Sequence, residues 1–571
     1  MFVRVKSTPN SPRCSVQIVE STRQGKKVRQ QLVKHVGIAQ DEKNLEELKL
    51  LGEELIIQIE KERSGAFPII APEELAKLTY EGRNRRKEGR ERQKGESEAL
   101  EVDLRNLREK QRVIEGTTEV FGRVYEEMGF DEIFGETQAQ RKSAEILKNC
   151  VLARLSNPGS KRRTASLLER DFAIRIALDK IYRMMDALVP RLDDIQKIAA
   201  AKASRLFGGK IDLLLYDVTT LHFESQQVDS LREFGYSKDG KFNEVQVVLA
   251  LLTTREGIPL CYKLFGGSKA ETKTLIESVE ELKRDFEVSR TILVAGRGMF
   301  SKANLLSVEK KGWDYIIAAK LKSLKRELRE QILLRAELER KSNSSESWAL
   351  EFEVAPGQRL VVSYSADREE RDRRLRAKAL ERLKKKQKAN GKISSKSLIK
   401  NGAAKQYLKG SSGEDFELCQ RKIEQEERWD GLHGCVTNNH SLGSKDVLAS
   451  YSDLWKIEEA FKVNKHDLRI RPIFHWTEDR IRAHVAICFM CFCVAKHTEY
   501  RVRVQQEPLS FARIRNELLA VQASILKDSS TGKFYRMPSS MNTVAKKIYR
   551  CFSLERSEEA HQIPSYKIKS I

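Results

Sequence analysis

Three polar residues in the C-terminal third of the chain have types and a spacing that could serve catalysis. Tyr451, Glu458 and Lys465 follow one another at seven-residue steps. Seven residues are about two turns of an α-helix, so these side chains would form one stripe with about 10 Å between members. A carboxylate between an aromatic hydroxyl and an ammonium group could hold a metal ion while its neighbours contact a DNA backbone. Taken alone the stripe is weak evidence, since such residues are common on exposed helices.

An acidic residue also ends a strongly apolar strand, in the stretch Ile211-Asp212-Leu213-Leu214-Leu215-Tyr216-Asp217. A carboxylate in a low-dielectric sheet is costly unless it binds a cation or a hydrogen-bond donor. Asp217 therefore indicates a function. A later apolar strand over residues 291–295 ends at Gly296, and a neighbouring part of the same site is expected there.

The pattern around these residues predicts a mixed sheet with helices. Alternating and apolar runs predict the order strand, strand, strand, helix, strand, helix, strand over residues 211–217, 245–253, 259–265, 272–286, 291–295, 301–310 and 313–319. Residues 1–38 read as a small β element, residues 41–63 as a helix, and residues 101–205 as helical almost throughout. Between residues 322 and 428 the regularity fails apart from strands at 348–354 and 359–364, which is typical of an insertion.

Charge indicates a polyanionic partner. The 571 residues include 105 Lys and Arg against 82 Asp and Glu, a formal net charge of +23. No run of 18 apolar residues offers a membrane explanation, and the N-terminus lacks the apolar stretch of a secretory signal. A chain of this length is expected to form several domains.

Three basic segments could contact phosphate. Residues 83–94 are nearly all charged, residues 368–388 hold eleven Lys or Arg against four Asp or Glu, and Ser160-Lys161-Arg162-Arg163-Thr164 could open a helix toward an anion. Each also has a simpler interpretation, as a solvated connector, a solvated helix and an ordinary capped turn respectively. The sequence leaves both interpretations open.

The nine cysteines are too sparse for a disulfide scaffold, which fits a reducing cytoplasm. Cys488, Cys491 and Cys493 resemble a metal cluster by spacing, but they lie in an apolar run. We expect them to be small buried core residues.

Over much of its length the sequence resembles the bacterial insertion-sequence transposases of the DDE class, in the branch marked by Tyr-x2-Arg-x3-Glu-x6-Lys. Matching stretches are Lys34-His35-Val36-Gly37, Tyr216-Asp217-Val218-Thr219-Thr220, Phe234-Gly235-Tyr236-Ser237-Lys238-Asp239-Gly240, Gly257-Ile258-Pro259-Leu260, Arg297-Gly298-Met299-Phe300-Ser301-Lys302-Ala303-Asn304-Leu305, Trp429-Asp430-Gly431 and Arg471-Pro472-Ile473-Phe474-His475. Together, and in this order, they are highly specific.

The resemblance implies that Asp217 is the first catalytic Asp and Glu458 the catalytic Glu, both as metal ligands. It also implies DNA contacts from a set of residues close to them, namely Tyr451, Lys462, Lys465 and Arg297. Leu454 stands at the Arg position of the signature, so one polar contact of the family is missing.

The second catalytic Asp of the family is missing too. The resemblance places it within a pattern like Val-Ala-Asp-Arg-Gly-Met, where this chain has Val294-Ala295-Gly296-Arg297-Gly298-Met299. Such transposases use two Mg²⁺ ions, for which Mn²⁺ can substitute, held by three carboxylates. Gly296 offers no side-chain oxygen. Glu271 and Asp314 lie in the same region, but neither has the strand-end position.

The resemblance implies an α/β fold, a ribonuclease-H-like mixed sheet with helices that is interrupted by an insertion domain and preceded by a small β element and a helical domain. The expected domains are residues 1–95, 96–208, 209–321, 322–428 and 429–571, the third and fifth being the two parts of the catalytic core. The expected partners are double-stranded DNA, as inverted repeats and target, and a second copy of the chain, in a bacterial cytoplasm at the nucleoid. The function is then a cut-and-paste transposase impaired at Gly296. The alternatives are a catalytically silent DNA-binding relative and a nuclease or RNA-binding protein with the same core.

Overall fold

The computed structural model describes residues 1–7, 14–24, 27–39, 45–46, 48–53, 55–56, 59, 102–207, 211, 213–225, 227–235, 243–269, 292–296, 302–342, 347–387, 393, 406–410 and 416–571. Several sequence predictions fall outside these residues. They are the helix at 272–286, the basic segment 83–94, and the residues Arg297 and Glu271.

A small antiparallel sheet opens the chain, as predicted. Its strands are β1 (Phe2–Ser7), β2 (Cys14–Gln24) and β3 (Lys27–Ala39), in the order β1-β2-β3. Val16, Ile18 and Val19 of the central strand are buried. The described residues between 45 and 59 are helical, as their leucine spacing predicts.

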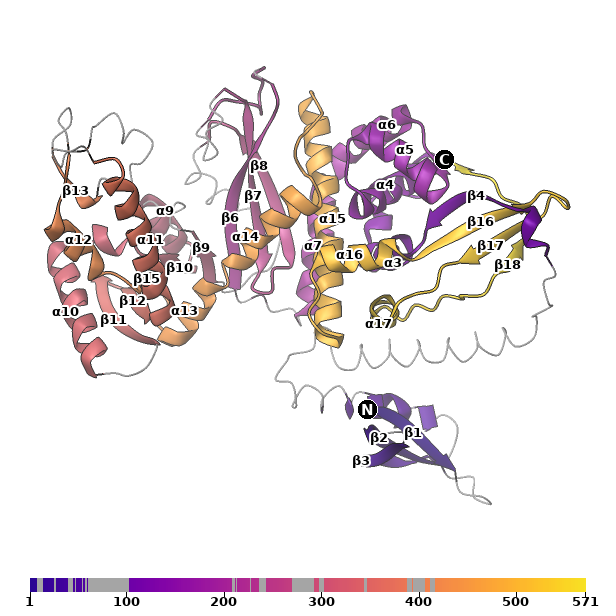
Figure 1. Cartoon of the computed structure of the whole chain (residues 1–571), viewed down its shortest axis with the longest axis horizontal. Coiled ribbons are helices and arrows are strands. Elements are labelled where there is room, and N and C mark those ends of the chain that lie inside the picture. The colour runs from indigo at the N-terminus through magenta and orange to yellow at the C-terminus, as the bar shows by residue number, and fades with distance from the viewer. Residues whose placement is uncertain are drawn as a thin grey trace.

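The central feature of the chain is an eight-stranded mixed sheet in the order β11-β12-β15-β10-β9-β6-β7-β8 (Figure 1). Its strands are β6 (Leu213–His222), β7 (Gln246–Thr254), β8 (Pro259–Gly266), β9 (Ile292–Ala295), β10 (Asp314–Ala318), β11 (Ser347–Ala355), β12 (Gln358–Ser365) and β15 (Leu432–Thr437). β6, β9 and β10 run parallel, while all the other neighbours are antiparallel. The five strands predicted over residues 211–319 therefore lie side by side.

Each face of this sheet is covered by helices, because its strands alternate between two hydrophobic cores. Leu213 and Leu215 of β6 belong to one core, which also holds side chains of α14 (Trp455–Lys462) and α15 (Glu478–Gln505). Leu214 and Tyr216 belong to the other core, which holds side chains of α9 (Lys302–Lys310) and α10 (Arg326–Ser342). The alternation decides which residues of β6 can face α14.

Two strands of the expected insertion extend the main sheet. β11 pairs with β12, and β12 pairs with β15, which in turn pairs with β10. The described remainder of the insertion consists of α10, α11 (Ala366–Lys384), β13 (Leu408–Lys409), β14 (Glu417–Leu418) and α12 (Gln420–Glu427). The inserted segment is thereby fixed to the sheet that carries Asp217.

A helical part precedes the sheet in the chain and is joined by the C-terminal residues. Its helices are α3 (Gly116–Met128), α4 (Gln138–Ser156), α5 (Lys161–Phe172), α6 (Leu178–Leu188) and α7 (Leu192–Leu206), packed against α15 (Figure 1). After α15 follow α16 (Phe511–Leu519), β16 (Gln522–Asp528), β17 (Phe534–Pro538), α17 (Thr543–Cys551), β18 (His561–Ile563) and β19 (Lys569–Ser570). β16 pairs with β4 (Leu107–Ile114), which directly precedes α3, in a sheet of order β18-β17-β16-β4, and β19 pairs with β5 (Ile174–Arg175).

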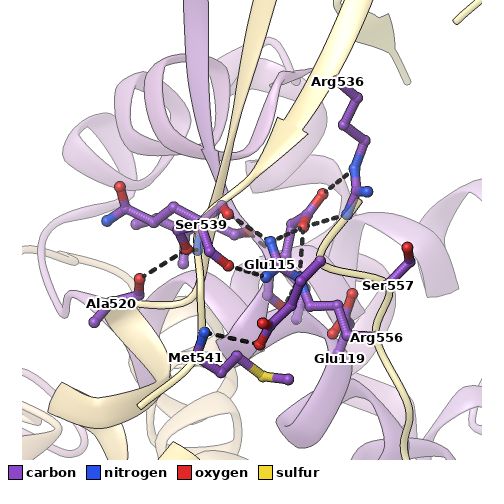
Figure 2. A network of polar contacts seen from close by, with 12 residues as sticks. Glu115, Glu119, Ala520, Arg536, Ser539, Met541, Arg556 and Ser557 are labelled. Carbon is purple, nitrogen blue, oxygen red and sulfur yellow. Dashed lines mark hydrogen bonds and ion pairs between the residues drawn. The ribbon is translucent and has the colours of Figure 1, made fainter. Parts of the chain in front are cut away.

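A partly buried ion cluster ties the C-terminal residues to the start of α3 (Figure 2). The carboxylate of Glu115 accepts hydrogen bonds from Arg536 at 2.5 and 2.9 Å and from Arg556 at 2.8 and 3.1 Å. Arg556 also donates to the carbonyl oxygen of Ser539 at 2.8 Å, and its side chain is 2% exposed. The cluster therefore makes the helical part and the C-terminal strands one unit.

The long helix α15 forms the core between the sheet and the helical part. By length and composition it could cross a membrane, although the sequence has no run of 18 apolar residues, but 94% of its apolar window is buried inside the protein. Cys488, Cys491 and Cys493 are fully buried in it, and burial raises the pKa of each thiol. The prediction that they are core residues is confirmed.

Candidate active site

The parallel pairing of β6 and β9 brings Asp217 beside Gly296, the residue after the end of β9. β6 continues to His222, so Asp217 lies within the strand and the prediction that it ends the strand is wrong. β6 and β9 pair in parallel with Leu215 opposite Val294 and Tyr216 opposite Ala295. The next residues along the chain are Asp217 and Gly296 respectively.

Asp217 and position 296 also share one face of the sheet. Leu215 and Val294, each two residues earlier, both belong to the core that contains α14. Since strand side chains alternate, Asp217 lies on that face, and a side chain at position 296 would lie there too. Asp217 is half-buried.

Glu458 reaches this region from α14, which packs against β6 (Figure 1). Ile457, Ala460 and Phe461 of this helix are buried in the core on the Asp217 face, while Glu458 is exposed. Glu458 and Gly296 line the same cavity, of about 1020 Å³, together with Ala318 at the end of β10. The cavity therefore reaches the ends of β9 and β10, and Asp217 adjoins it through its neighbour Gly296 without lining it.

The helix that was expected to run from Tyr451 through Lys465 is interrupted, so that prediction is wrong. Tyr451 lies in α13 (Ser444–Ser452), Glu458 in α14, and Lys465 in a π-helical turn (Val463–Asp467). Tyr451 nevertheless lines the cavity with Glu458. Its ring centroid is 5.1 Å from that of His433.

Lys465 faces the strand that carries Asp217. Its Nζ donates to Oγ1 of Thr219 at 2.5 Å. Thr219 is two residues beyond Asp217 in β6 and therefore on the same face of the sheet. Lys465 and Tyr451 are both half-buried, so neither is an ordinary solvated residue, whereas Lys462 is exposed at the end of α14.

Sequence analysis missed His433, which lines the cavity from β15. It directly follows the Trp429-Asp430-Gly431-Leu432 stretch, and one polar residue in a short apolar strand was the only signal. Asp430 has a structural role. Its Oδ1 accepts a hydrogen bond from Nη1 of Arg376 in α11 at 2.5 Å. Burial raises the pKa of Asp430 against the opposing effect of the guanidinium.

Gly296 has room for a side chain. Apart from its chain neighbours, no heavy atom of the described residues lies within 4 Å of the place where a Cβ would be, and the φ of Gly296 is outside the left-handed region. An aspartate there would meet neither a clash nor backbone strain.

Asp314 cannot supply the missing carboxylate. It pairs with Ile292, at the other end of β9, four residues or about 13 Å from Gly296. Its Oδ2 accepts a hydrogen bond from Asn439 at 2.7 Å, and the residue is buried. Asp314 therefore has a structural role, as the hydrogen-bond partner of Asn439.

Among the described residues of this region, Asp217 and Glu458 offer carboxylates, which Mg²⁺ prefers, whereas position 296 offers none. In the part of the chain that the structure describes, no group of three His, Cys, Asp or Glu side chains could hold a metal ion.

The helix opening at Ser160 has the ordinary cap that the simpler interpretation expects, while Arg162 and Arg163 are exposed. Ser160 caps α5 by accepting a hydrogen bond from the backbone N–H of Arg163. Lys161 is buried, and burial lowers its pKa to about 8. This lysine is therefore poorly suited to a phosphate at the surface.

Comparison with protein families identifies the class of the chain. Residues 208–494, about half of the chain, match the transposase DDE domain. The chain is thus a transposase with a DDE domain, a class of enzymes that transfer phosphoryl groups on DNA. Residues 2–64 match the N-terminal domain of IS1634 family transposases, and the chain belongs to that family. No match was found among curated proteins.

Proposed function

We propose that this transposase acts by cut and paste on the ends of an insertion sequence, and that its chemistry is impaired because Gly296 replaces the second catalytic Asp. The observation that carries the proposal is the register of β6 and β9, which puts Gly296 beside Asp217 on the cavity that Glu458 lines. The strand order β8-β7-β6-β9-β10, with only β7 reversed against its neighbours β6 and β8, supports a ribonuclease-H-like core.

Asp217 and Glu458 are the residues that would hold a divalent metal ion in this site. Enzymes of the family generally use such ions, Mg²⁺ or Mn²⁺, to cleave DNA and to join its 3′ end to a target. Without a carboxylate at position 296 the set is incomplete, and this deficiency is the proposed cause of the impairment.

DNA would approach through the cavity and its basic wall. Arg368 and Arg382 of α11 and Lys386 just beyond it line the cavity that contains Gly296 and Glu458. This placement favours a DNA-facing α11 over a merely solvated helix. Lys462, Lys465, Tyr451 and Arg297 are the proposed contacts near the scissile phosphate. The proposed partners are inverted-repeat and target DNA and a second copy of the chain, in the cytoplasm at the nucleoid.

The domains proposed from the sequence are residues 1–95, 96–208, 209–321, 322–428 and 429–571. We refine the last of these, because residues 511–570 pair and pack with the helical part through β16 and Glu115. In this division residues 429–505 complete the catalytic core, and the C-terminal residues serve the helical part.

The alternative is a catalytically silent relative that still binds transposon ends. Metal-dependent nicking of inverted-repeat DNA by the chain as it stands separates the two functions. Weak nicking that Asp217→Asn removes would support an impaired enzyme, and its complete absence would support the silent relative. A preference for RNA over duplex DNA would instead favour a nuclease or an RNA-binding protein.

Lys465 and Tyr451 are expected to contribute to DNA binding. The Lys465→Ala, Tyr451→Phe double variant should bind inverted-repeat DNA more weakly and fold normally. Loss of one phosphate contact should lower the slope of log affinity against log salt by about 0.9. Fluorescence anisotropy titrations at several salt concentrations measure this slope. Lys445→Ala, an exposed lysine on α13, is the control. Equal slopes for the double variant and the parent would contradict the proposed role.

A further inference from the structure

The turn that follows the Glu458 helix is held by two arginines of the helical part. Nη1 of Arg515, in α16, donates to the carbonyl oxygen of Asp467 at 2.8 Å, and Nη2 donates to its Oδ1 at 3.4 Å. Nη1 of Arg154, in α4, donates to the carbonyl oxygens of Leu468 and Arg469 at 2.7 and 3.0 Å. Three successive carbonyl groups are therefore bound by arginines from outside the sheet.

These contacts stabilise backbone that is otherwise unfavourable. The α-helical hydrogen-bond pattern ends at Lys462, and the next five residues form a single π-helical turn. Arg469 has a φ of 46°, in the left-handed region that side chains other than glycine rarely adopt. Such a conformation persists where surrounding contacts determine it. Arg154 and Arg515 supply those contacts, and Arg154 is only 3% exposed.

The same turn carries Lys465 to the strand of Asp217. Lys465 is two residues before Asp467, and its Nζ is bound to Thr219. Asn464, which is buried, ties the turn back to α14 by donating from Nδ2 to the carbonyl oxygen of Ala460 at 3.0 Å. A shift of the turn would therefore move Lys465 directly and the Glu458 helix through Asn464.

We infer that Arg515 and Arg154 are positioning residues for Lys465 and for the Glu458 helix. They fix the position of the turn at residues 463–469 relative to the helical part. They act through the backbone of residues 467–469, so the DNA approaching Lys465 meets an ammonium group whose place is already set. For its effect on DNA this inference rests on the proposed function, whereas its effect on the turn does not.

Chemical labelling of Lys465 tests the positioning without DNA. In the full chain Lys465 is half-buried and bound to Thr219, so an amine-reactive reagent should modify it slowly. Arg515→Ala should raise the rate at Lys465 about tenfold, the size expected for losing a charged hydrogen bond. Arg515→Lys, which keeps one donor, should give an intermediate rate. Mass spectrometry of the modified peptides measures these rates.

Arg513→Ala is the matched control, because Arg513 lies on the same helix with a side chain 60% exposed and pairs with Glu517. Equal labelling rates at Lys465 for Arg515→Ala and Arg513→Ala would overturn the inference. Arg515 is preferred to Arg154 for this test, since the deeper arginine risks general unfolding.

A double-mutant cycle then tests the consequence for DNA. If Arg515 acts through Lys465, Arg515→Ala should weaken DNA binding in the parent and have no further effect in the Lys465→Ala background. Additive losses would show that Arg515 acts elsewhere and would overturn the inference. If Lys465→Ala itself binds DNA as the parent does, the proposed role of Lys465 in DNA binding fails, and the labelling rates alone decide on the positioning.

Discussion

Replacing Gly296 by aspartate is expected to raise the rate of Mg²⁺- or Mn²⁺-dependent cleavage at inverted-repeat ends by roughly 100-fold or more. Losing even an indirect partner of a metal site costs about 10 to 100-fold, and a direct ligand should cost more. The aspartate would lie beside Asp217 on the same face of the sheet, in open space and without backbone strain. The initial rate of nicking on a labelled duplex measures the gain.

The shape and the charge of the new side chain can be separated. Gly296→Asn has nearly the same volume as Gly296→Asp but no carboxylate, so it should leave the rate at the parent level. Adding Asp217→Asn or Glu458→Gln to Gly296→Asp should abolish the gain, because each removes another member of the same metal-binding set. A gain that survives these changes would mean that another site cleaves the DNA.

DNA affinity is expected to fall by roughly 10³ or more between 50 and 200 mM salt, as it does for proteins that make six or more phosphate contacts. The expectation rests on the net charge of +23 and on Arg368, Arg382 and Lys386, which line the cavity from α11 and its end. Binding to a duplex of unrelated sequence should show a similar slope, because phosphate contacts carry no sequence information. An affinity that stays constant over this range would contradict a phosphate-binding surface.

Strands such as β7 and β9 of the central sheet were accessible from the sequence because each is a short apolar run. The strand predicted at residues 245–253 is β7 (Gln246–Thr254), and the one predicted at 291–295 is β9 (Ile292–Ala295). Strands buried on both faces by helices have few polar residues, which makes Asp217 conspicuous. Asp217 was singled out as a candidate for this physical reason.

Pairings between distant segments could not be inferred from local pattern. β4 and β16 are about 400 residues apart, and nothing in either strand specifies the other. The insertion joins the main sheet because β12 pairs with β15, which is another long-range contact. Hydrophobic periodicity identifies the buried face of a strand but not its neighbour.

The break between α13 and α14 also depends on tertiary contacts. Seven-residue spacing fits a continuous helix, but Asp453 at the break is paired with Arg255 of the β7–β8 hairpin at 2.7 Å and with Lys456 at 2.7 Å. The first partner is about 200 residues away in sequence. Periodicity alone therefore put Tyr451 and Lys465 on one helix, whereas the structure brings them to the site from two separate elements.

Metal binding tests the central claim most directly, because it requires no knowledge of the DNA ends. The claim is that position 296 lacks the one carboxylate needed beside Asp217 and Glu458. Titration of Mn²⁺ into the full chain, with the free ion measured by electron paramagnetic resonance, compares Gly296→Asp with Gly296→Asn. We predict that the aspartate variant binds Mn²⁺ at least about tenfold more tightly, and that Asp217→Asn removes the difference. Equal Mn²⁺ affinities for the aspartate and asparagine variants would contradict the account.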